Sequence, residues 1–543
     1  MKLRNIILIG AAAMLALASC SDDYLNTPPR DQMSPDGFYS TPSQCNQGIL
    51  GVYADLRYIS DYEYLMMSEV RSDNMWVEPR PDGERSYSEI GTFRANASEV
   101  TFEQTWNAWY KLIYDANMAL QKIEKCDFTN EAIKNQFLGE AHFLRGWAYF
   151  ELARLYGNVP LILEPMSSQE ANNVKQTDAR TVITGTAIPD LEFALDNLPE
   201  KGKMVDGLGS AVTGRADKSA AQGMLARVYM QLAGFPFNDA EAESKAKTYL
   251  EQLLAKKSKY WAPTIDAWRS QWLPSNANKY SVFAIQYRTG GSGNPAVFDM
   301  SPALPPSFTS IRIFGNQIYP NKALMYQFER TQSNGNKDLR GENYTYIHGY
   351  DKESASFPTY SQQFEDVTVD GVTTSQQVNA INYKYMASKR KCKEFGVDGT
   401  IENSMVDYYD WPVNYPVIRI EDMMLLYAEI LCDEGDIAGA MNQVNEIRSR
   451  AGVDLRPTSG ISKNEATKYI RLERQLELFG EGVRWFDEVR YGTWQQDIIN
   501  KFNSYNNVDG TDVSSVADGR YLYPIPSNQM SIVPGLYSQN KGY

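Results

Sequence analysis

The sequence predicts a mostly α-helical protein, built as an α–α superhelix of about four helix pairs with a long, loop-rich insertion that contains minor β structure. Three observations lead to this prediction. Several long segments place apolar residues at spacings of three and four. One helix pair follows a known repeat pattern, described below. Between about residues 258 and 414 the chain is instead punctuated by Gly, Pro, Ser and Asn.

The first element along the chain is a targeting segment. Lys2 and Arg4 precede an apolar run over residues 6–18, which is too short to cross about 30 Å of hydrocarbon as a helix and is typical of a secretory signal. The run ends in Leu17-Ala18-Ser19-Cys20, which resembles a bacterial lipobox. We therefore expect residues 1–19 to be a lipoprotein signal peptide. Cys20 is then lipidated, and residues 20–45 form the lipidated tether, anchored by two or three acyl chains.

Helical patterns follow the tether. They are expected over the following ranges: about 43–70, Trp106–Glu124, Glu131–Tyr156, Ala216–Gly234, Asp239–Leu254, 421–450 and Lys463–Tyr491. Asn130 is a suitable N-cap for the third of them, because its side chain can accept a hydrogen bond from a free amide of the first turn. That helix has apolar residues on two sides, which indicates a helix packed between neighbours.

The segment 421–450 carries the repeat pattern. Small, large and turn residues stand at offsets 0, 3, 7, 8, 12, 16 and 19, and they are Ala428, Leu431, Gly435, Asp436, Ala440, Val444 and Ile447. These offsets match the tetratricopeptide pattern, in which small residues lie where two helices touch and Gly-Asp forms the turn. The helical scaffold is therefore expected to be tetratricopeptide-like.

The insertion interrupts this scaffold. It contains short β-like runs at Ser281–Tyr287 and Val367–Thr374, separated by glycine- and proline-rich loops. A long irregular segment inside a helical protein is usually functional. We expect it to form a ligand-binding cap on the helices.

Composition excludes several functional classes. Lys and Arg number 53 against 67 Asp and Glu, and this net charge of −14 argues against a nucleic-acid binder. With two His and no closely spaced Cys pair, a zinc module is excluded. We expect no cofactor and no metal site, although a structural Ca²⁺ stays open. A disulfide also stays open among four cysteines: Cys45, Cys126, Cys392 and Cys432.

Several blocks of the sequence resemble the SusD/RagB family of Bacteroidetes nutrient-uptake lipoproteins. They occur in the family's order and extend to the C-terminus: Ser72–Asn74, Trp106–Asn117, Glu140–Leu161, Gly214–Tyr229, Pro416–Glu429, Ile470–Gly492, Tyr523–Pro526 and Gln539–Tyr543. The resemblance implies one SusD-like domain over residues 46–543. Its helical scaffold covers about 46–257 and 415–495, its cap about 258–414, and its C-terminal tail 496–543.

The resemblance also implies a function. Members of this family are lipid-anchored to the outer membrane, face the cell exterior and bind nutrients without catalysis. The protein is expected to capture an oligosaccharide and deliver it to a partner SusC-like TonB-dependent β-barrel transporter, on which it acts as a lid. Two alternatives stay open: the same architecture binding peptides or glycopeptides, as the RagB branch suggests, and a surface glycan hydrolase.

Candidate ligand-binding residues come from the regions where the family binds its ligands. A sugar site needs flat aromatic faces and planar polar groups. The residues of these types in those regions are Asp73, Asn74, Trp76, Tyr87, Arg288, Phe314, Tyr319, Tyr344 and Tyr346. Trp76 is the first choice, because it follows the Ser72–Asn74 block and precedes a Pro/Gly/Arg loop.

No catalytic motif supports the hydrolase alternative. A nucleophile elbow, HExxH, a Walker A loop and DxDxDG are all missing from the sequence. Charged residues do alternate near the C-terminal end of the scaffold: Arg471, Glu473, Arg474, Glu477, Glu481 and Arg484. We interpret them as a salt-bridge network that locks the last helices, in preference to a catalytic carboxylate pair.

Overall fold

The computed structural model describes a chain that is largely helical. The described residues are 38–77, 85–274, 278–297, 318–348, 364–369, 371–377, 380–385, 387, 389–397, 406, 410–505, 516 and 519–543. The predicted signal peptide, Cys20 and Phe314 lie outside these residues. The expected class, a mostly α-helical superhelix with an irregular, minor-β insertion, is confirmed.

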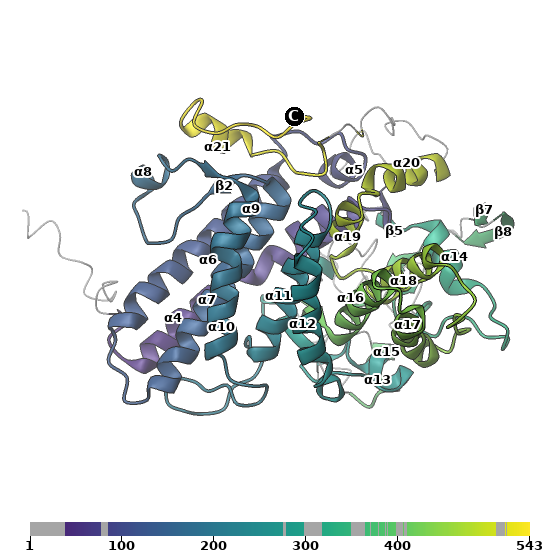
Figure 1. The fold of residues 1–543 in the computed structure, drawn as a ribbon, viewed down its shortest axis with the longest axis horizontal. Coiled ribbons are helices and arrows are strands. Elements are labelled where there is room, and N and C mark those ends of the chain that lie inside the picture. Colours follow the sequence, from purple (N-terminus) through teal and green to yellow (C-terminus); the bar gives the residue numbers. More distant parts are fainter. Residues whose placement is uncertain are drawn as a thin grey trace, which may run out of the picture.

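The N-terminal helices form the first layer (Figure 1). Helix α4 (Pro42–Ala54) starts with a capping box, in which Thr41 Oγ1 accepts from the Gln44 amide at 3.3 Å. A 3₁₀ turn, η1 (Asp55–Tyr58), joins α4 to the π-helix η2 (Ser60–Val70). Helices α6 (Val100–Lys125) and α7 (Glu131–Tyr156) then pack side by side. Asn130 caps α7 as predicted, accepting from the Ala132 amide at 3.0 Å.

A helical stretch that the sequence analysis does not predict packs on α7. It consists of α9 (Ala179–Val182), the π-helix η3 (Ile183–Ala187) and α10 (Ile188–Asn197). Gly185 and Pro189 interrupt its apolar pattern, and because both residue types have low helix propensity, the sequence does not predict a helix here. Tertiary packing stabilises the helix instead, since Leu191 and Ala194 are fully buried.

Two further helix pairs continue the layer. Helices α11 (Lys218–Ala233) and α12 (Ala242–Leu254) form one pair, and α16 (Ile420–Asp433) and α17 (Ile437–Ala451) form the other. The second pair is the predicted repeat. Ala428 and Ala440 are fully buried at the helix contact, and the Asp436 carboxylate caps α17 by accepting from the Gly439 amide at 2.8 Å.

The predicted helix over Lys463–Tyr491 is broken in the structure. Helix α18 covers Lys463–Glu477 and α19 covers Arg484–Arg490. Gly482, in the turn between them, has a φ of 71°, which L residues rarely adopt. A Cβ there would also lie 2.4 Å from Cβ of Tyr64, so the turn can pack directly on η2. Helices α20 (Trp494–Ser504) and α21 (Ser527–Ile532) follow.

The strands form two-stranded antiparallel ladders. The ladders are β1 (Met75–Val77) with β5 (Ile318–Pro320), β2 (Val159–Pro160) with β3 (Gln176–Thr177), β4 (Ser281–Ile285) with β10 (Tyr415–Arg419), β6 (Tyr346–Ile347) with β9 (Ile381–Asn382), and β7 (Phe364–Val369) with β8 (Val372–Gln377). The remaining short helices are α5 (Arg85–Gly91), α8 (Ser168–Ala171), α13 (Ile265–Ser270), α14 (Lys322–Glu329) and α15 (Lys389–Glu394). The β runs expected near residues 281 and 367 are thus present, the second as a hairpin.

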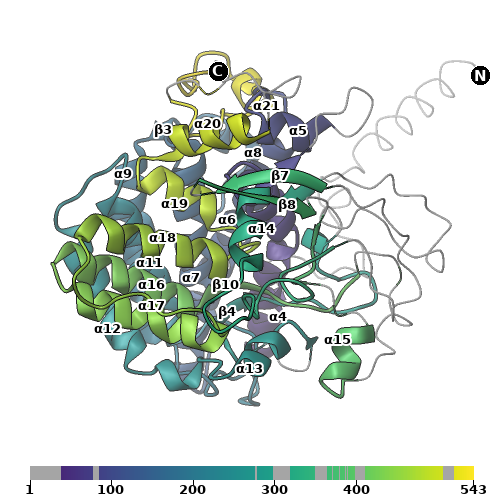
Figure 2. The same cartoon turned by 90° about the vertical axis from the view of Figure 1, so that its right-hand side faces the viewer.

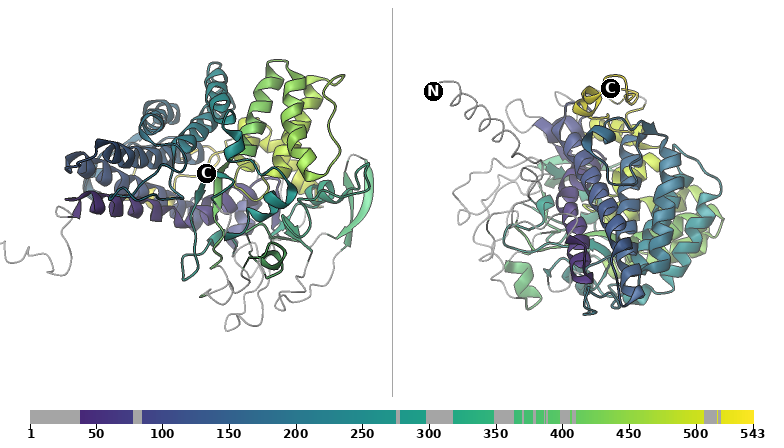
Figure 3. Two further views of the ribbon diagram at one scale, coloured as in Figure 1. Left: turned by 90° about the horizontal axis from the view of Figure 1, so that it is seen from below. Right: turned by 90° about the vertical axis from the view of Figure 1, so that its left-hand side faces the viewer.

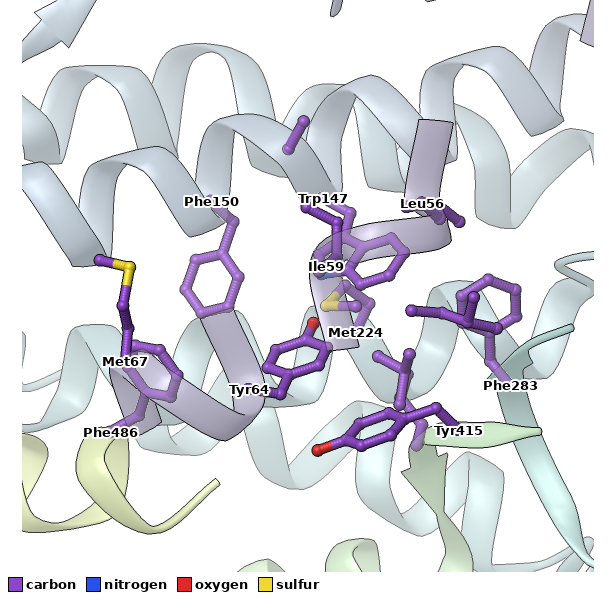
Figure 4. Close-up of a cluster of buried hydrophobic side chains, with 14 of the residues drawn as sticks. Leu56, Ile59, Tyr64, Met67, Trp147, Phe150, Met224, Phe283, Tyr415 and Phe486 are labelled. Carbon is purple, nitrogen blue, oxygen red and sulfur yellow. The ribbon is translucent and has the colours of Figure 1, made fainter. Parts of the chain in front are cut away.

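The described parts of the insertion and the helix pairs lie on opposite sides of the molecule. Seen from below, the α16–α18 helices (light green) lie on one side and the strands and short helices of the insertion on the other (Figure 3). Helix η2 runs through the middle, between α7 and the β4–β10 ladder. Its Tyr64 stacks on Tyr415 with ring centroids 5.4 Å apart, and Trp147 of α7 meets Phe283 of β4 edge-on at 5.6 Å (Figure 4).

A buried network of ion pairs joins the insertion to the last helices. Glu477 of α18 contacts Arg340, Arg419 and Arg450 at 2.8, 2.9 and 2.7 Å, and all four side chains are at most 1% exposed. Arg340 also pairs with Glu473 at 2.7 Å. The predicted salt-bridge network is confirmed for Glu473, Arg474, Glu477, Glu481 and Arg484, and it extends into the insertion. The Arg471 guanidinium instead lies 3.8 Å from the centre of the Tyr491 ring.

Candidate functional site

A cleft of about 610 Å³ opens where the end of α4 meets the exit of β4. Figure 2 shows α4 and β4 near one another in the lower part of the molecule. We call this site the α4–β4 cleft. Its lining residues come from three separate segments: Asn46, Leu50, Tyr53, Ala54, Leu56 and Arg57; Asp206, Val212, Thr213, Gly214 and Arg215; and Ala284, Ile285, Gln286, Tyr287, Arg288 and Ser292.

The floor of the cleft is rigid. Tyr287 is buried, and its hydroxyl donates to the Arg57 carbonyl at 2.7 Å and lies 2.8 Å from Ser60 Oγ. Burial raises the pKa of Tyr287 well above its usual value, so the hydroxyl keeps its proton. Tyr53 is fixed in a similar way, since its hydroxyl accepts from the Ala216 amide at 3.0 Å. The cleft is therefore preformed.

One rim of the cleft is a glycine-rich loop, residues 288–293, held by a single carboxylate. The side chain of Asp410 accepts from the amides of Gly290, Gly291 and Gly293 at 2.6, 2.9 and 2.9 Å. A Cβ at Gly293 would lie 2.2 Å from Cα of Asp410, so only glycine permits this approach. The loop closes on itself where the Arg288 amide donates to the Ser292 carbonyl at 3.1 Å. Arg288 is thereby placed on the rim with its side chain exposed.

Three arginines face the cleft. Arg57 donates from Nη2 to the Gly291 carbonyl, while its Nε is buried and has no hydrogen-bond partner among the described residues. Arg215 pairs with the buried Glu140 at 3.3 Å and also bonds to Asn46. Together with the exposed Arg288, they present planar donor groups that can bind hydroxyl or acidic oxygens in pairs.

The lining includes one carboxylate, that of Asp206, among the described residues. It accepts from the amides of Leu208 and Ser210 at 2.8 and 2.9 Å. These amides, the Ser210 amide first, lower the pKa of Asp206 and keep it ionised. Both hydrogen bonds go to Oδ1, which binds this oxygen to its own loop.

Exposed aromatic rings lie next to the cleft. Tyr58 and Tyr62 stack with centroids 5.7 Å apart and planes 16° apart, and Tyr58 is 44% exposed. The Arg57 guanidinium lies 5.1 Å from the centre of the Tyr58 ring. Neither tyrosine lines the cleft itself, but Tyr58 places an exposed aromatic face beside Arg57. An aromatic face next to polar donors is the combination expected for a sugar site.

Of the sequence-predicted residues, Arg288 lines this cleft, whereas Trp76 lies in the packed interior. Trp76 is 5% exposed and stacks on Tyr505 with centroids 4.1 Å apart. Tyr319 is its cross-strand neighbour in the β1–β5 ladder. This placement favours a structural role for Trp76 over ligand contact, which corrects our first choice. The reason is the long-range partner Tyr505, which no local pattern reveals.

Asp73 and Asn74 are also engaged within the protein. Asp73 receives two hydrogen bonds from Arg484, at 2.7 and 2.8 Å. Although burial acts in the opposite direction, the Arg484 guanidinium lowers the pKa of Asp73. Asn74 is buried and donates to Glu69 Oε2 at 2.7 Å. Both side chains hold the turn before β1, which favours a structural role.

The predicted tyrosines of the insertion, Tyr344 and Tyr346, are also buried and form contacts within the protein. Tyr344 is 8% exposed, with the Arg269 guanidinium 3.9 Å from its ring centre and its hydroxyl bonded to Glu394. Tyr346 is fully buried and donates to Glu329 at 2.8 Å. The predicted Tyr87 lies in α5, but its side chain is not among the described ones.

The sequence analysis missed Arg57, Tyr58 and Arg215, for which no local signal exists.

Three general findings concern the described residues. They contain no group of three or more His, Cys, Asp or Glu side chains placed to hold a metal ion. No helix among them has the length and apolar character needed to cross a membrane. Cys45, Cys126, Cys392 and Cys432 are buried, and no disulfide joins any two of these four.

Comparison with known proteins identifies relatives across the chain. The profile of the SusD family matches residues 281–543, and a second profile, described as starch-binding associating with outer membrane, matches residues 23–230. SusD-like protein P25 of Formosa agariphila is 25% identical over 100% of both chains. A SusD homologue from Bacteroides thetaiotaomicron superposes with a TM-score of 0.72 at 21% identity, covering 94% of this chain and 99% of that one. Surface glycan-binding protein A from Bacteroides fluxus gives 0.68 at 22% identity, covering 92% and 99%.

Proposed function

Because this chain belongs to the SusD/RagB family, we propose that it captures an oligosaccharide in the α4–β4 cleft and delivers it to a SusC-type TonB-dependent β-barrel transporter. The protein is then a lipoprotein anchored through Cys20 to the outer membrane, with its ligand site facing the cell exterior. The lipobox at residues 17–20 and a family profile described as associating with the outer membrane support this localisation.

One observation carries the choice of ligand site: a preformed cleft joins planar donors to an exposed aromatic face. Arg57 and Arg288 supply the donors, and the Tyr58–Tyr62 pair supplies the face. Aromatic stacking contributes roughly 0.5–1.5 kcal/mol per ring beyond burial, and each net hydrogen bond about 1 kcal/mol. Since Asp410 already orders the rim loop, little entropy is lost when a ligand binds.

The cleft is better suited to binding than to hydrolysis. Glycoside hydrolysis of the usual kind requires two carboxyl groups flanking the scissile bond. Asp206 is the one carboxylate in the described lining, and its Oδ1 accepts from two backbone amides of its own loop. We propose a non-catalytic role on this basis.

Binding can be tested on a glycan array with soluble protein that starts after Cys20. Wild type should bind a restricted set of oligosaccharides, and Tyr58→Ala should weaken binding by roughly three- to tenfold through the loss of one stacking face. Phe364→Ala is the control, since Phe364 is an aromatic residue that is 58% exposed on β7 and does not line the α4–β4 cleft. Equal loss in both variants would argue against this cleft. Turnover of any bound glycan would instead favour a hydrolase.

Delivery requires a second experiment. Full-length, affinity-tagged protein expressed in its native host should co-purify with a TonB-dependent transporter from detergent-extracted outer membranes. Cys20→Ala should release the protein from the membrane fraction. A wild-type protein that remains soluble after export, or that purifies without a transporter at native expression, would refute this part of the proposal.

A further inference from the structure

The α4–β4 cleft differs in charge from the rest of the molecule. The protein carries a net charge of −14, yet the described lining of the cleft contains three arginines and one carboxylate. A local excess of positive charge in an acidic protein suggests a specific purpose, because solubility alone does not require it.

Two of the three arginines are not neutralised by a neighbouring acid. Among the described residues, neither Arg57 nor Arg288 forms an ion pair, whereas Arg215 pairs with Glu140. Asp61 lies near Tyr287 but does not line the cleft. Because Glu140 already neutralises Arg215, Asp206 offsets one of the other two arginines, and the cleft keeps one net positive charge.

Arg57 is held in place with donor capacity to spare. Its Nη2 is fixed on the Gly291 carbonyl, and its Nε is buried at the cleft without a partner among the described residues. A buried N–H group without a partner costs free energy. Because this Nε is closed to solvent, an incoming acceptor would instead bind the other N–H groups of the guanidinium. An acidic oxygen is the strongest such acceptor.

Arg57 and Arg288 line the same cleft and come from two different segments. Arg57 ends the α4 side, and Arg288 begins the glycine-rich loop whose Gly291 receives the Arg57 hydrogen bond. An acid group held there meets two guanidinium forks, and the sugar ring that carries it has Tyr58 beside it. This arrangement suits a pyranose with an acidic substituent.

We propose that the cleft is selective for anionic glycans, those carrying carboxylates or sulfate esters, with Arg57 and Arg288 binding the acidic group. The inference rests on the proposed function and specifies its ligand class. A hydrogen bond to a charged group contributes more than a neutral one, so the acidic form of a glycan should bind roughly 10- to 100-fold more tightly than its neutral counterpart.

Matched ligand pairs test this directly by isothermal titration calorimetry. One pair is oligogalacturonate with its fully methyl-esterified form, and the other is a sulfated galactan oligosaccharide with its desulfated form. We expect one acidic ligand to bind at least tenfold more tightly than its neutral partner, and to weaken as salt is raised. The pair that responds identifies whether the acid is a carboxylate or a sulfate.

Variants then assign the selectivity to the cleft. Arg288→Gln should remove most of the preference for the acidic partner, and Arg288→Lys should keep part of it, because charge remains while the bidentate fork is lost. Arg180→Gln is the control, since Arg180 is an arginine of similar charge that pairs with Asp239 outside the cleft. Melting temperatures of all three should agree within a few degrees.

The outcomes separate this inference from the proposed function. Equal binding of acidic and neutral partners, or binding of neutral glycans alone on the array, would overturn the anionic selectivity and leave the proposed function intact. An acid preference that survives Arg288→Gln and Arg57→Gln would overturn the assignment to this cleft. Failure to bind any glycan would refute both.

Discussion

Trp76 and Tyr505 stack face to face, with ring centroids 4.1 Å apart and planes 8° apart. Trp76 lies in β1 and Tyr505 caps the end of α20, so the contact joins the first third of the chain to its C-terminal region. The Tyr505 hydroxyl accepts from the Lys322 amide at 3.1 Å, which ties β5 and α14 to the same point. This stack is a junction of three segments.

Trp76→Ala is therefore expected to destabilise the protein. Truncating a buried tryptophan leaves a cavity and typically costs about 3–5 kcal/mol in the free energy of unfolding. Urea unfolding monitored by circular dichroism measures this loss. Tyr58→Ala, at an exposed ring, should change the same quantity by less than about 1 kcal/mol. If the Trp76 variant unfolds at the wild-type midpoint, the ring is not part of the core.

Glu477→Gln should be among the most destabilising single substitutions in the scaffold. The Glu477 carboxylate contacts Arg340, Arg419 and Arg450, all of them buried. Removing its charge leaves buried arginine charge uncompensated, which costs about 3–5 kcal/mol. Lys463→Met breaks the half-exposed pair with Asp433 and should cost at most about 1 kcal/mol. Similar unfolding free energies for the two variants would contradict the network's role.

The carboxyl of Glu69 makes stability depend on pH. Burial raises the pKa of Glu69 to about 7, even though Asn74 and Gly482 donate to it. The folded protein then holds this proton more tightly than the unfolded chain, so stability from this group is full below the unfolded pKa and is lost as pH rises toward 7. The loss between pH 5 and pH 8 is about 2 kcal/mol.

Comparison with Glu69→Gln isolates this effect. The variant cannot titrate at this position, so the difference in unfolding free energy between wild type and variant should change by about 2 kcal/mol between pH 5 and pH 8. The free energy of unfolding of the wild type should fall relative to that of the variant as pH rises. Glu170→Gln, at an exposed helix-capping residue, supplies the control. A difference that is flat with pH would show that Glu69 titrates normally.

Lys501 holds the segment that leads into β1. Its ammonium donates to the carbonyl of Ser72 and, at 3.4 Å, to those of Val70 and Arg71. Lys501→Met should leave these carbonyls without their buried donor and loosen the turn. Hydrogen exchange read by mass spectrometry should become faster in peptides covering residues 70–77. Lys468→Met, at an exposed position on α18, should leave these peptides unchanged.

Local patterns predicted the scaffold well because helices depend on nearby residues. The expected range Glu131–Tyr156 matches α7, and the repeat offsets at 421–450 located α16, its turn and α17. Packing decides the details that local signals leave open. The Lys463–Tyr491 pattern contains Gly480 and Gly482, which suit a tight bend after a helix, and the chain bends there so that Gly482 lies against Tyr64.

The site residues were harder to predict for a related reason. A sequence identifies an aromatic residue in a loop, but its exposure depends on whether a distant ring covers it. Tyr505 covers Trp76, and Arg269 covers Tyr344, whereas Tyr58 keeps an exposed face. Arg288 follows a β-like run in the expected region and lines the cleft, and its role in binding stays a prediction.

By itself, the sequence predicted the export signal, and it determined the helix pairs and the charge alternation of the last helices, since these features depend on residues close together along the chain. Only the tertiary structure decided which polar groups share a cleft. Arg57, Arg215 and Arg288 come from three segments that are brought together by long-range packing, and a guanidinium becomes available to a ligand only when that packing supplies no acid beside it.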